Sequence, residues 1–286
     1  MTTNNNIPRR WSQLAYAGES RVPVPAVPNA GSWPLVFLGR NAEGQFTDPQ
    51  GQPITFELRH PDSIDFAGAE LTRIKQTLAD LTPKQIAIAK YWGQGTPTKQ
   101  WTPIIDRLID TYGLSAPHAA RLLAAVHGAI QDAFVVTWHY KYLWDSPRPN
   151  QLDQNLATIL CTPKHPSYPS GHSTISGCAA EVLSYYFPTE REKLLDLAKE
   201  ASVSRNYAGI HFYADCEQGL RLGRQIGQLI VSALKQQADA QSLMIDIPQT
   251  TDRNAKLMPP PYRQALPYPY QQKCSSKLDW RGEDEK

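Results

Sequence analysis

Apolar residues recur at helical spacing through the middle of the chain, from about residue 61 to residue 238. The first stripe has an apolar side chain every three or four positions, at Ile64, Ala67, Leu71, Ile74, Leu78 and Leu81. This spacing predicts an amphipathic helix with one face against a core. Similar patterns predict further helices over residues 82–92, 104–112, 116–143, 171–186, 189–207 and 215–237.

Capping residues mark several of these helix starts. Thr82-Pro83-Lys84-Gln85 has the pattern of a capping box with proline in the first helical turn. Thr189 and Glu192 predict a second capping box, Ser115 precedes the longest helix, and Asp215 with Gln218 predicts the cap of the last helix.

Both ends of the chain lack such periodicity. Residues 1–60 are rich in Pro, Gly and Asn, and the chain beyond residue 238 is rich in Pro and Tyr and ends in charged residues. The sequence therefore predicts an all-α bundle of about six or seven helices over 61–238, with irregular arms at 1–60 and 239–286. The C-terminal arm could bind an aromatic groove of another module, but draping over its own domain or a neighbouring subunit is the favoured interpretation.

Three glycines recur at every fourth position of the predicted last helix: Gly219, Gly223 and Gly227. No strand precedes them, so they do not form a dinucleotide-binding loop. We interpret them as a strip for close helix packing.

Composition excludes several classes of protein. The net charge of +2 over 286 residues argues against a nucleic-acid binder. No run of about 18–20 apolar residues suggests a membrane-spanning helix, and the basic N-terminus has no apolar stretch typical of a secretory signal. The four cysteines, Cys161, Cys178, Cys216 and Cys274, have no C-x-x-C spacing. We therefore expect reduced cysteines, no zinc site and a cytoplasmic protein.

Candidate chemistry begins where two prolines, Pro166 and Pro169, lead into a predicted helix. Ser170 is a natural N-cap, and Gly171 and His172 fall in the first turn. Unpaired N–H groups at a helix start attract anions, and His172 can transfer a proton beside them. A capped helix without a ligand explains the same residues.

Three basic residues and a second histidine complete the set. Lys141 ends the longest helix, and Arg148 lies between two prolines that stiffen the backbone. Arg205 falls in the last turn of a predicted helix, and His211 follows soon after it. Taken singly, each has a structural explanation: a solvated helix end, a favourable charge at a helix C-terminus, or a core histidine.

Together these residues form an ordered pattern. Lys141-x6-Arg148-Pro149, Pro169-Ser170-Gly171-His172 and Ser204-Arg205-x5-His211 resemble the signature of the acid-phosphatase and vanadium haloperoxidase superfamily, with no substitution at a ligand position. The resemblance covers roughly residues 60–235. The segments LTPKQIAIAKYW and HFYADCEQGLRLGRQIG look like the soluble bacterial haloperoxidase branch.

The resemblance implies a role for each matching residue. Lys141, Arg148, Ser170, Gly171 and Arg205 would bind an oxyanion, His211 would be the ligand of vanadium or the nucleophile toward phosphorus, and His172 would act as general acid–base. Trp138 and His165 would line the entrance. The position matching His165 is an aromatic carbocycle in a chloroperoxidase of the family and a histidine in bromoperoxidases; a plain loop residue before Pro166 is the alternative interpretation of His165. Asp215, four residues after His211, would orient a histidine or only cap its helix.

The resemblance implies an enzyme of one of two kinds. The favoured one is a bacterial vanadate-dependent haloperoxidase, an oxidoreductase that oxidises bromide or iodide with hydrogen peroxide and acts on small organic substrates. Vanadate would be its cofactor and phosphate a competing anion. The alternative is a soluble acid phosphatase, a hydrolase that forms a phosphohistidine at the same site. A binding or scaffold protein is a third, disfavoured hypothesis. We expect a homo-oligomer without nucleic-acid or membrane partners.

Overall fold

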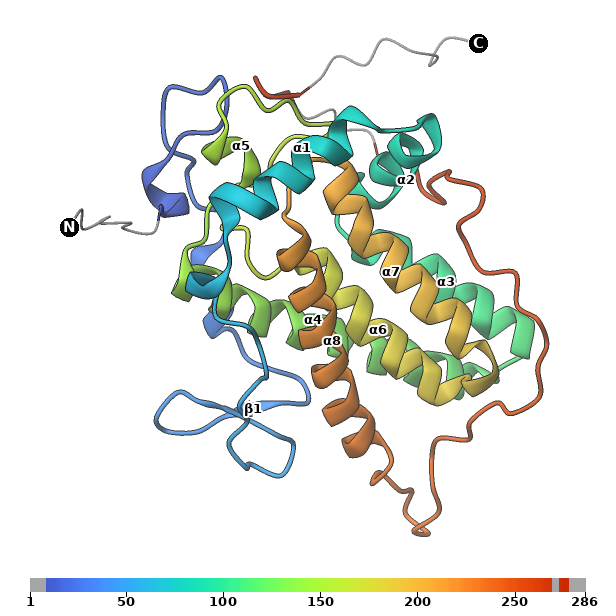
Figure 1. Ribbon diagram of the computed structural model, residues 1–286. Coiled ribbons are helices and arrows are strands. Elements are labelled where there is room, and N and C mark those ends of the chain that lie inside the picture. Colours follow the sequence, from blue (N-terminus) through green and yellow to red (C-terminus); the bar gives the residue numbers. More distant parts are fainter. Residues whose placement is uncertain (1–8, 269–272, 278–286) are drawn as a thin grey trace.

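Helix α6 (Gly171–Tyr186) lies at the centre of the fold and is buried along almost its whole length. It packs against α4, α7 and α8 in the computed structural model, which describes residues 9–268 and 273–277 (Figure 1). The charged end predicted for the C-terminal arm lies outside the described residues.

The described chain is almost entirely helical, which confirms the predicted fold class. Its elements are α1 (Leu71–Ala79), α2 (Pro83–Gly93), α3 (Thr98–Tyr112), α4 (Ala116–Trp144), the four-residue α5 (Pro149–Leu152), α6, α7 (Arg191–Tyr207) and α8 (Tyr213–Leu234). In the described residues, the only sheet is the antiparallel pair β1 (Gly39–Arg40) and β2 (Phe46–Thr47), in which Gly39 pairs with Thr47.

The glycine strip on α8 lets that helix approach α6 closely. A Cβ atom at position 223 would lie 2.0 Å from the Thr174 carbonyl oxygen, and one at position 219 would lie 2.7 Å from the Ser170 carbonyl oxygen. Only glycine fits such a contact, as the spacing predicted. The close approach also joins the starts of the two helices, because the Ser170 N–H donates to the Asp215 carbonyl at 2.9 Å.

The capping predictions have mixed outcomes. The capping box of Thr82 and Gln85 is present at the start of α2. The box predicted at Thr189 is wrong: Pro188–Glu190 forms a 3-10 turn and α7 begins at Arg191. A tertiary contact explains the difference, since the Thr189 hydroxyl lies 3.1 Å from that of Tyr112.

Two other helix starts differ from the predictions. A π-helical turn, Phe66–Glu70, precedes α1, so the first stripe is divided between two helical segments. Helix α3 begins at Thr98, six residues before the predicted start, because Pro103 is accommodated inside its first turns.

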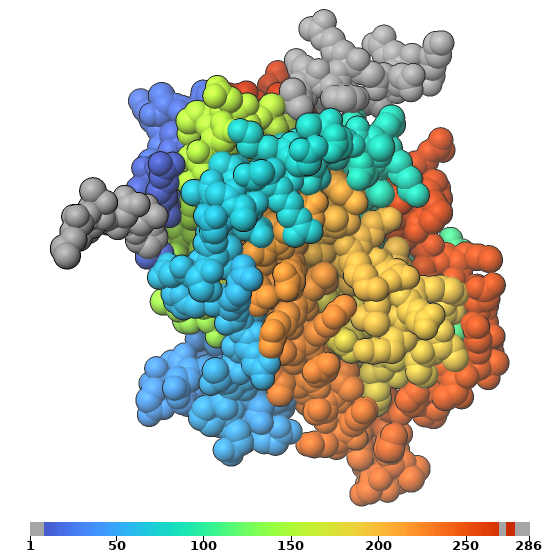
Figure 2. Space-filling model, viewed as in Figure 1, coloured from blue at the N-terminus to red at the C-terminus, as the bar shows by residue number. Residues whose placement is uncertain are grey.

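The N-terminal arm is anchored to the bundle by a buried carboxylate. Asp132, on α4, accepts hydrogen bonds from the backbone N–H groups of Val36, Phe37 and Leu38 at 2.6, 2.8 and 2.9 Å. Farther along the arm, the N–H of Arg59 donates to Gln218 on α8, where arm and helix lie side by side (Figure 2).

The C-terminal arm drapes over its own domain along α7, α3 and α2 (Figures 1 and 2). The Ala255 N–H donates to Glu190, the Tyr262 hydroxyl donates to Glu200, and the Gln264 amide donates to the Tyr91 carbonyl. The described part of the arm, including residues 258–268, therefore follows the favoured interpretation.

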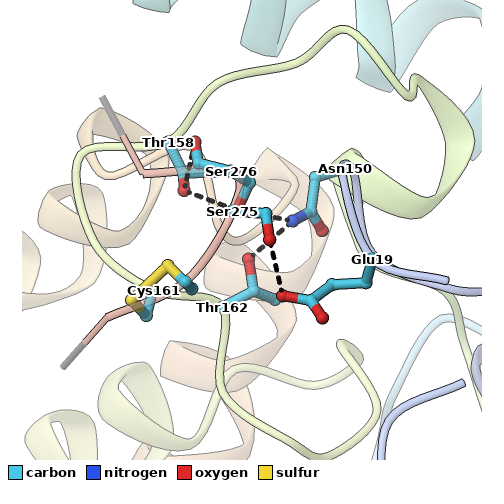
Figure 3. Close-up of a disulfide and its surroundings, with 8 residues drawn as sticks. Glu19, Asn150, Thr158, Cys161, Thr162, Ser275 and Ser276 are labelled. Atoms are coloured by element: carbon cyan, nitrogen blue, oxygen red, sulfur yellow. Dashed lines mark hydrogen bonds between the residues drawn. A yellow bond between two sulfur atoms is a disulfide. The ribbon is translucent and has the colours of Figure 1, made fainter. Parts of the chain in front are cut away.

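A disulfide joins Cys161 to Cys274 and overturns the prediction of reduced cysteines for this pair; Cys178 and Cys216 are free and buried. Spacing gave no sign of the pair because the two residues are 113 apart in sequence and meet only where the C-terminal arm folds back. Around the disulfide, Ser275 donates to Glu19 and the Asn150 amide to Ser276 (Figure 3). Disulfides are typical of oxidising compartments, so cysteine usage no longer supports a cytoplasmic location.

One segment of the described residues, Ala116–Leu152, is long and apolar enough to cross a membrane by length and composition alone. The expectation that the chain has no membrane-spanning helix therefore stays a prediction. Half of the apolar window is buried inside the protein, and a buried core helix passes the same test of length and composition.

We predict that the disulfide stabilises the fold. Cys161→Ser should lower the free energy of unfolding by about 2–4 kcal/mol, because a long loop is no longer closed in the unfolded chain. Denaturant titration with and without dithiothreitol measures the effect. The Cys161→Ser/Cys274→Ser variant is the control and should not respond to the reductant. Equal stability of the oxidised and reduced wild type would contradict the prediction.

Candidate active site

Three basic side chains are buried together where α4, α5 and α7 approach the start of α6. Lys141 and Arg148 are fully buried, and Arg205 is 1% exposed. Burial lowers the pKa of all three groups, that of Lys141 well below its ordinary value and that of Arg205 to about 10. We call these three residues the cationic cluster.

Lys141 is held by the loop that precedes α6. Its ammonium group donates to the carbonyl oxygens of Pro166 and Ser167 at 2.8 and 2.6 Å. Burial, followed by repulsion from Arg148, is the cause of its lowered pKa. The last turn of α4 and the extended loop thus fix a charge that the sequence alone left as a possible solvated helix end.

Arg148 makes more hydrogen bonds than the other two residues of the cationic cluster. Its Nη1 donates to the Ile210 carbonyl at 2.7 Å and to His211 Nε2 at 2.9 Å, while Nε donates to the His165 carbonyl at 3.1 Å. Its Nη2 lies 3.0 Å from His165 Nδ1. The guanidinium therefore joins the loop before α6 to the segment between α7 and α8.

Arg205 reaches the site from the last turn of α7. Its Nε donates to the Ser204 hydroxyl at 2.9 Å and its Nη2 to the Ala89 carbonyl at 3.0 Å. A Cβ atom at position 93 would lie 3.1 Å from both terminal nitrogens of this guanidinium. Gly93, the last residue of α2, therefore makes room for the arginine.

His211 is oriented by Asp215. The carboxylate Oδ2 lies 2.9 Å from His211 Nδ1 and also accepts from the Phe212 N–H at 2.9 Å, so Asp215 both orients the histidine and caps α8. Burial raises the pKa of Asp215 to about 6, although a hydrogen bond from Ser167 opposes the shift. Burial lowers the pKa of His211, and Arg148 adds to that effect. With Nδ1–H donating to Asp215, Nε2 of the neutral ring carries the lone pair.

The start of α6 has the predicted capped geometry. The Ser170 hydroxyl accepts a hydrogen bond from the Ser173 N–H, so α6 begins at Gly171. A Cβ atom at position 171 would lie 3.9 Å from Lys141 Cε and 3.5 Å from the Trp138 ring. Gly171 thus lies between the cationic cluster and an aromatic wall.

His172 carries a ring nitrogen that has no partner in the described part of the chain. Burial, followed by the charge of Arg205, lowers the pKa of His172 well below its ordinary value, although the Trp92 backbone opposes the shift. Its buried Nε2 has no hydrogen-bond partner within the described residues. A buried nitrogen in this state is suited to accept a proton from a ligand or to bind one.

Trp138 and His165 lie together beside the cluster, with ring centroids 4.7 Å apart. His165 Nδ1 lies 3.0 Å from Arg148 Nη2, which can only donate, and 3.2 Å from the Pro166 carbonyl oxygen, which can only accept. Burial and the charges of Lys141 and Arg148 lower the pKa of His165 well below its ordinary value.

The donor set fits an oxyanion such as vanadate or phosphate. Three buried cations face a single buried carboxylate, Asp215, among the charged residues at the site. No cluster of three or more His, Cys, Asp or Glu side chains suited to a metal cation occurs in the described part of the chain. A tetrahedral anion would supply the missing negative charge and accept from the guanidinium groups and the Gly171 N–H.

The structure brings all nine sequence-predicted site residues into one region: Trp138, Lys141, Arg148, His165, Ser170, Gly171, His172, Arg205 and His211. Sequence analysis missed Ser167. It is fully buried, donates to Asp215 Oδ2 at 2.5 Å and lies 3.3 Å from His211 Nδ1. Its position three residues before Ser170, in a segment already singled out, was the available signal.

The helical bundle is similar to a known family. Residues 119–239 match the family described as the PAP2 superfamily. The helical core of this chain therefore resembles that superfamily, whose members include haloperoxidases and phosphatases, and the match supports an enzymatic role.

Individual relatives are distant. A vanadium chloroperoxidase from Curvularia inaequalis is 28% identical over an alignment that covers 37% of this chain and 23% of that protein. A bacterial vanadium-dependent iodoperoxidase has a TM-score of 0.61 at 22% identity, covering 81% of this chain and 61% of that one. An apo-type bacterial vanadium-dependent chloroperoxidase has a TM-score of 0.60 at 15% identity, covering 81% and 63%. The chain thus spans less than two thirds of each relative, and the structural matches establish a shared fold.

We predict that acid destabilises the anion-free protein and that phosphate protects it. His165, His172 and His211 have lowered pKa values, so between about pH 7 and pH 5 the unfolded chain binds more protons than the folded one. Each histidine contributes roughly 1.4 kcal/mol per pH unit to this loss of stability. Asp215, whose pKa is raised to about 6, opposes the trend only between about pH 4 and pH 6.

Thermal melts across this pH range, with and without phosphate, measure both effects. A bound anion favours the charged histidines, so phosphate should flatten the pH dependence. His172→Gln should reduce both the pH dependence and the phosphate effect. His139→Gln is the matched control: burial lowers the pKa of His139 outside the cationic cluster, so only the pH dependence should shrink. Melting temperatures that do not change with phosphate at any pH in this range would contradict the anion site.

Proposed function

We propose that this protein is a vanadate-dependent haloperoxidase that uses hydrogen peroxide to oxidise bromide or iodide to hypohalous acid. The observation that carries the proposal is the uncompensated cationic cluster beside two neutral histidines. Sequence similarity to a vanadium chloroperoxidase favours vanadate as the anion. When bound, vanadate activates hydrogen peroxide for attack by a halide.

The cationic cluster would hold the anion. Arg148 and Arg205 offer planar forks that match two oxygens at once, and Lys141 supplies a compact charge. The backbone carbonyls that now accept from these groups keep the side chains in place before the anion binds. Because the positions are fixed in advance, little reorganisation is needed when charge develops during the reaction.

His211 would provide the single protein ligand through Nε2. Asp215 accepts the Nδ1 proton and so keeps the lone pair on the other nitrogen. In the free protein that lone pair accepts from Arg148 Nη1 at 2.9 Å. Binding of the anion would therefore require Arg148 to exchange this hydrogen bond for one to an anion oxygen.

His172 would transfer protons at the opposite side of the site. Its buried Nε2 has no hydrogen-bond partner within the described residues, so this is the nitrogen that would accept and return a proton. The lowered pKa keeps this nitrogen unprotonated near neutral pH, as a general base for hydrogen peroxide requires.

A phosphatase would use the same residues differently. His211 Nε2 would attack the phosphorus of a phosphomonoester, the ester P–O bond would break and the oxygen would leave as an alcohol after taking a proton, and water would then hydrolyse the phosphohistidine. The short interval between His172 and Arg205, typical of compact bacterial acid phosphatases, favours this alternative. Activity measurements on one preparation separate the two functions.

We predict that the purified apo-protein brominates phenol red only after incubation with orthovanadate, and that phosphate inhibits this activity by competing for the site. Parallel samples without vanadate test hydrolysis of p-nitrophenyl phosphate. Hydrolysis without any vanadate-dependent bromination would overturn the proposal in favour of the phosphatase.

Two variants refine this prediction. His211→Ala should lose vanadate binding in equilibrium dialysis, because it removes the protein ligand. His172→Ala should retain vanadate but turn over about 10²–10⁴ times more slowly, as expected for a lost acid–base group. His118→Ala, at an exposed position outside the site, is the control. Wild-type vanadate affinity in His211→Ala would remove this residue from the site.

Halide choice is proposed to depend on His165. Arg148 Nη2 can donate a hydrogen bond to His165 Nδ1. That N–H group would otherwise be available to the anion, so this contact should limit the oxidising power of the loaded enzyme. We predict oxidation of bromide and iodide, little oxidation of chloride, and an altered pH profile in His165→Phe. Steady-state rates with the three halides test this, with His118→Phe as the control. Efficient oxidation of chloride by the wild type would refute the halide assignment alone.

A further inference from the structure

An apolar groove of about 420 Å³ lies between the N-terminal arm and α4. Its volume falls within the roughly 300–1,000 Å³ of small-molecule sites. We call it the aromatic groove; the residues used below are Val27, Trp33, His127, Ile130, Phe134 and Trp138. Trp33, from the arm, is 50% exposed, so a ring of the rim remains available for contact with a ligand.

The groove shares its inner wall with the candidate active site. Trp138 lines the groove and lies against His165, with 4.7 Å between ring centroids. Phe134 meets Trp138 edge to face at 5.6 Å, and a Cβ atom at position 171 would lie within 3.8 Å of both rings. Gly171 thus keeps the boundary between groove and cationic cluster thin.

The lining indicates what the groove can bind. Among the described residues, no Asp, Glu, Lys or Arg side chain lines it, so a charged ligand would lose its hydration without compensation. Three aromatic rings favour a flat aromatic ligand. His127, at the border of the groove, lies 3.4 Å from the Thr102 hydroxyl, and burial lowers its pKa, so a neutral polar group is present for one hydrogen bond.

We infer that the aromatic groove binds a neutral, electron-rich aromatic compound of the phenol or naphthol class, which accepts the halogen from hypohalous acid. This inference rests on the proposed haloperoxidase function. In the transfer, a ring carbon forms the carbon–halogen bond, the oxygen–halogen bond breaks, and the displaced ring proton leaves with hydroxide as water. The shared wall places such an acceptor next to the site where hypohalous acid would form.

Isothermal titration of the vanadate-free protein tests the groove directly. We expect 2-naphthol to bind with one-to-one stoichiometry and 2-naphthoate, which has the same rings but a charge, to bind at least about tenfold more weakly. Trp33→Ala should weaken naphthol binding by about tenfold, and Trp33→Phe should restore most of it. Val24→Ala is the control, since Val24 is 74% exposed on the same arm and does not line the groove.

Three results would count against binding of an aromatic compound in the groove. Absent or non-saturable binding of 2-naphthol, equal binding of 2-naphthoate, or unchanged affinity in Trp33→Ala would overturn the inference. If Trp33→Ala does not fold, the two ligands on the wild type still decide. Triiodide formation by the vanadate-loaded wild type needs no organic acceptor and is measured in parallel. Its absence would refute the proposed function, whereas failure of naphthol binding alone would refute only the groove.

Discussion

The burial of three positive charges beside a single carboxylate is the constraint on which the site depends. Removing a charged group from water is expensive unless it is paired and hydrogen-bonded. Here backbone carbonyl groups satisfy part of this requirement for Lys141, Arg148 and Arg205. Hydrogen bonds to neutral carbonyls leave the net charge uncompensated, and this excess positive charge suits the site to an anion.

The need for hydrogen-bond acceptors for the buried cations also explains why a loop and a turn lie beside the site. Most carbonyl groups of a helix are used within the helix, and the acceptors for Lys141 and Arg148 accordingly come from non-helical segments. The extended loop before α6 supplies the carbonyls of His165, Pro166 and Ser167, and the turn between α7 and α8 supplies that of Ile210. Close packing of α8 on α6, made possible by Gly223, keeps these two segments together.

Periodicity and motif order were sufficient to predict the helical bundle and to bring together the residues of the site. The errors arose where distant segments decide the local structure. Thr189 has the sequence of a helix cap but contacts Tyr112 instead, and Cys161 pairs with a cysteine on the far arm. Ser167 was missed for a related reason: a serine in a proline-rich loop carries no pattern, and its importance lies in contacts with Asp215 and His211 that only the folded chain creates.

Asp132 makes the attachment of the N-terminal arm largely independent of the side chains that the arm carries. One carboxylate on α4 accepts from three consecutive N–H groups of the N-terminal arm, so the arm contributes only backbone atoms to these bonds. The attachment therefore survives almost any change of side chain in the arm. In evolutionary terms, substitutions at positions such as Val27 and Trp33 can reshape the outer wall of the aromatic groove while the inner wall, formed by residues of α4, keeps its arrangement.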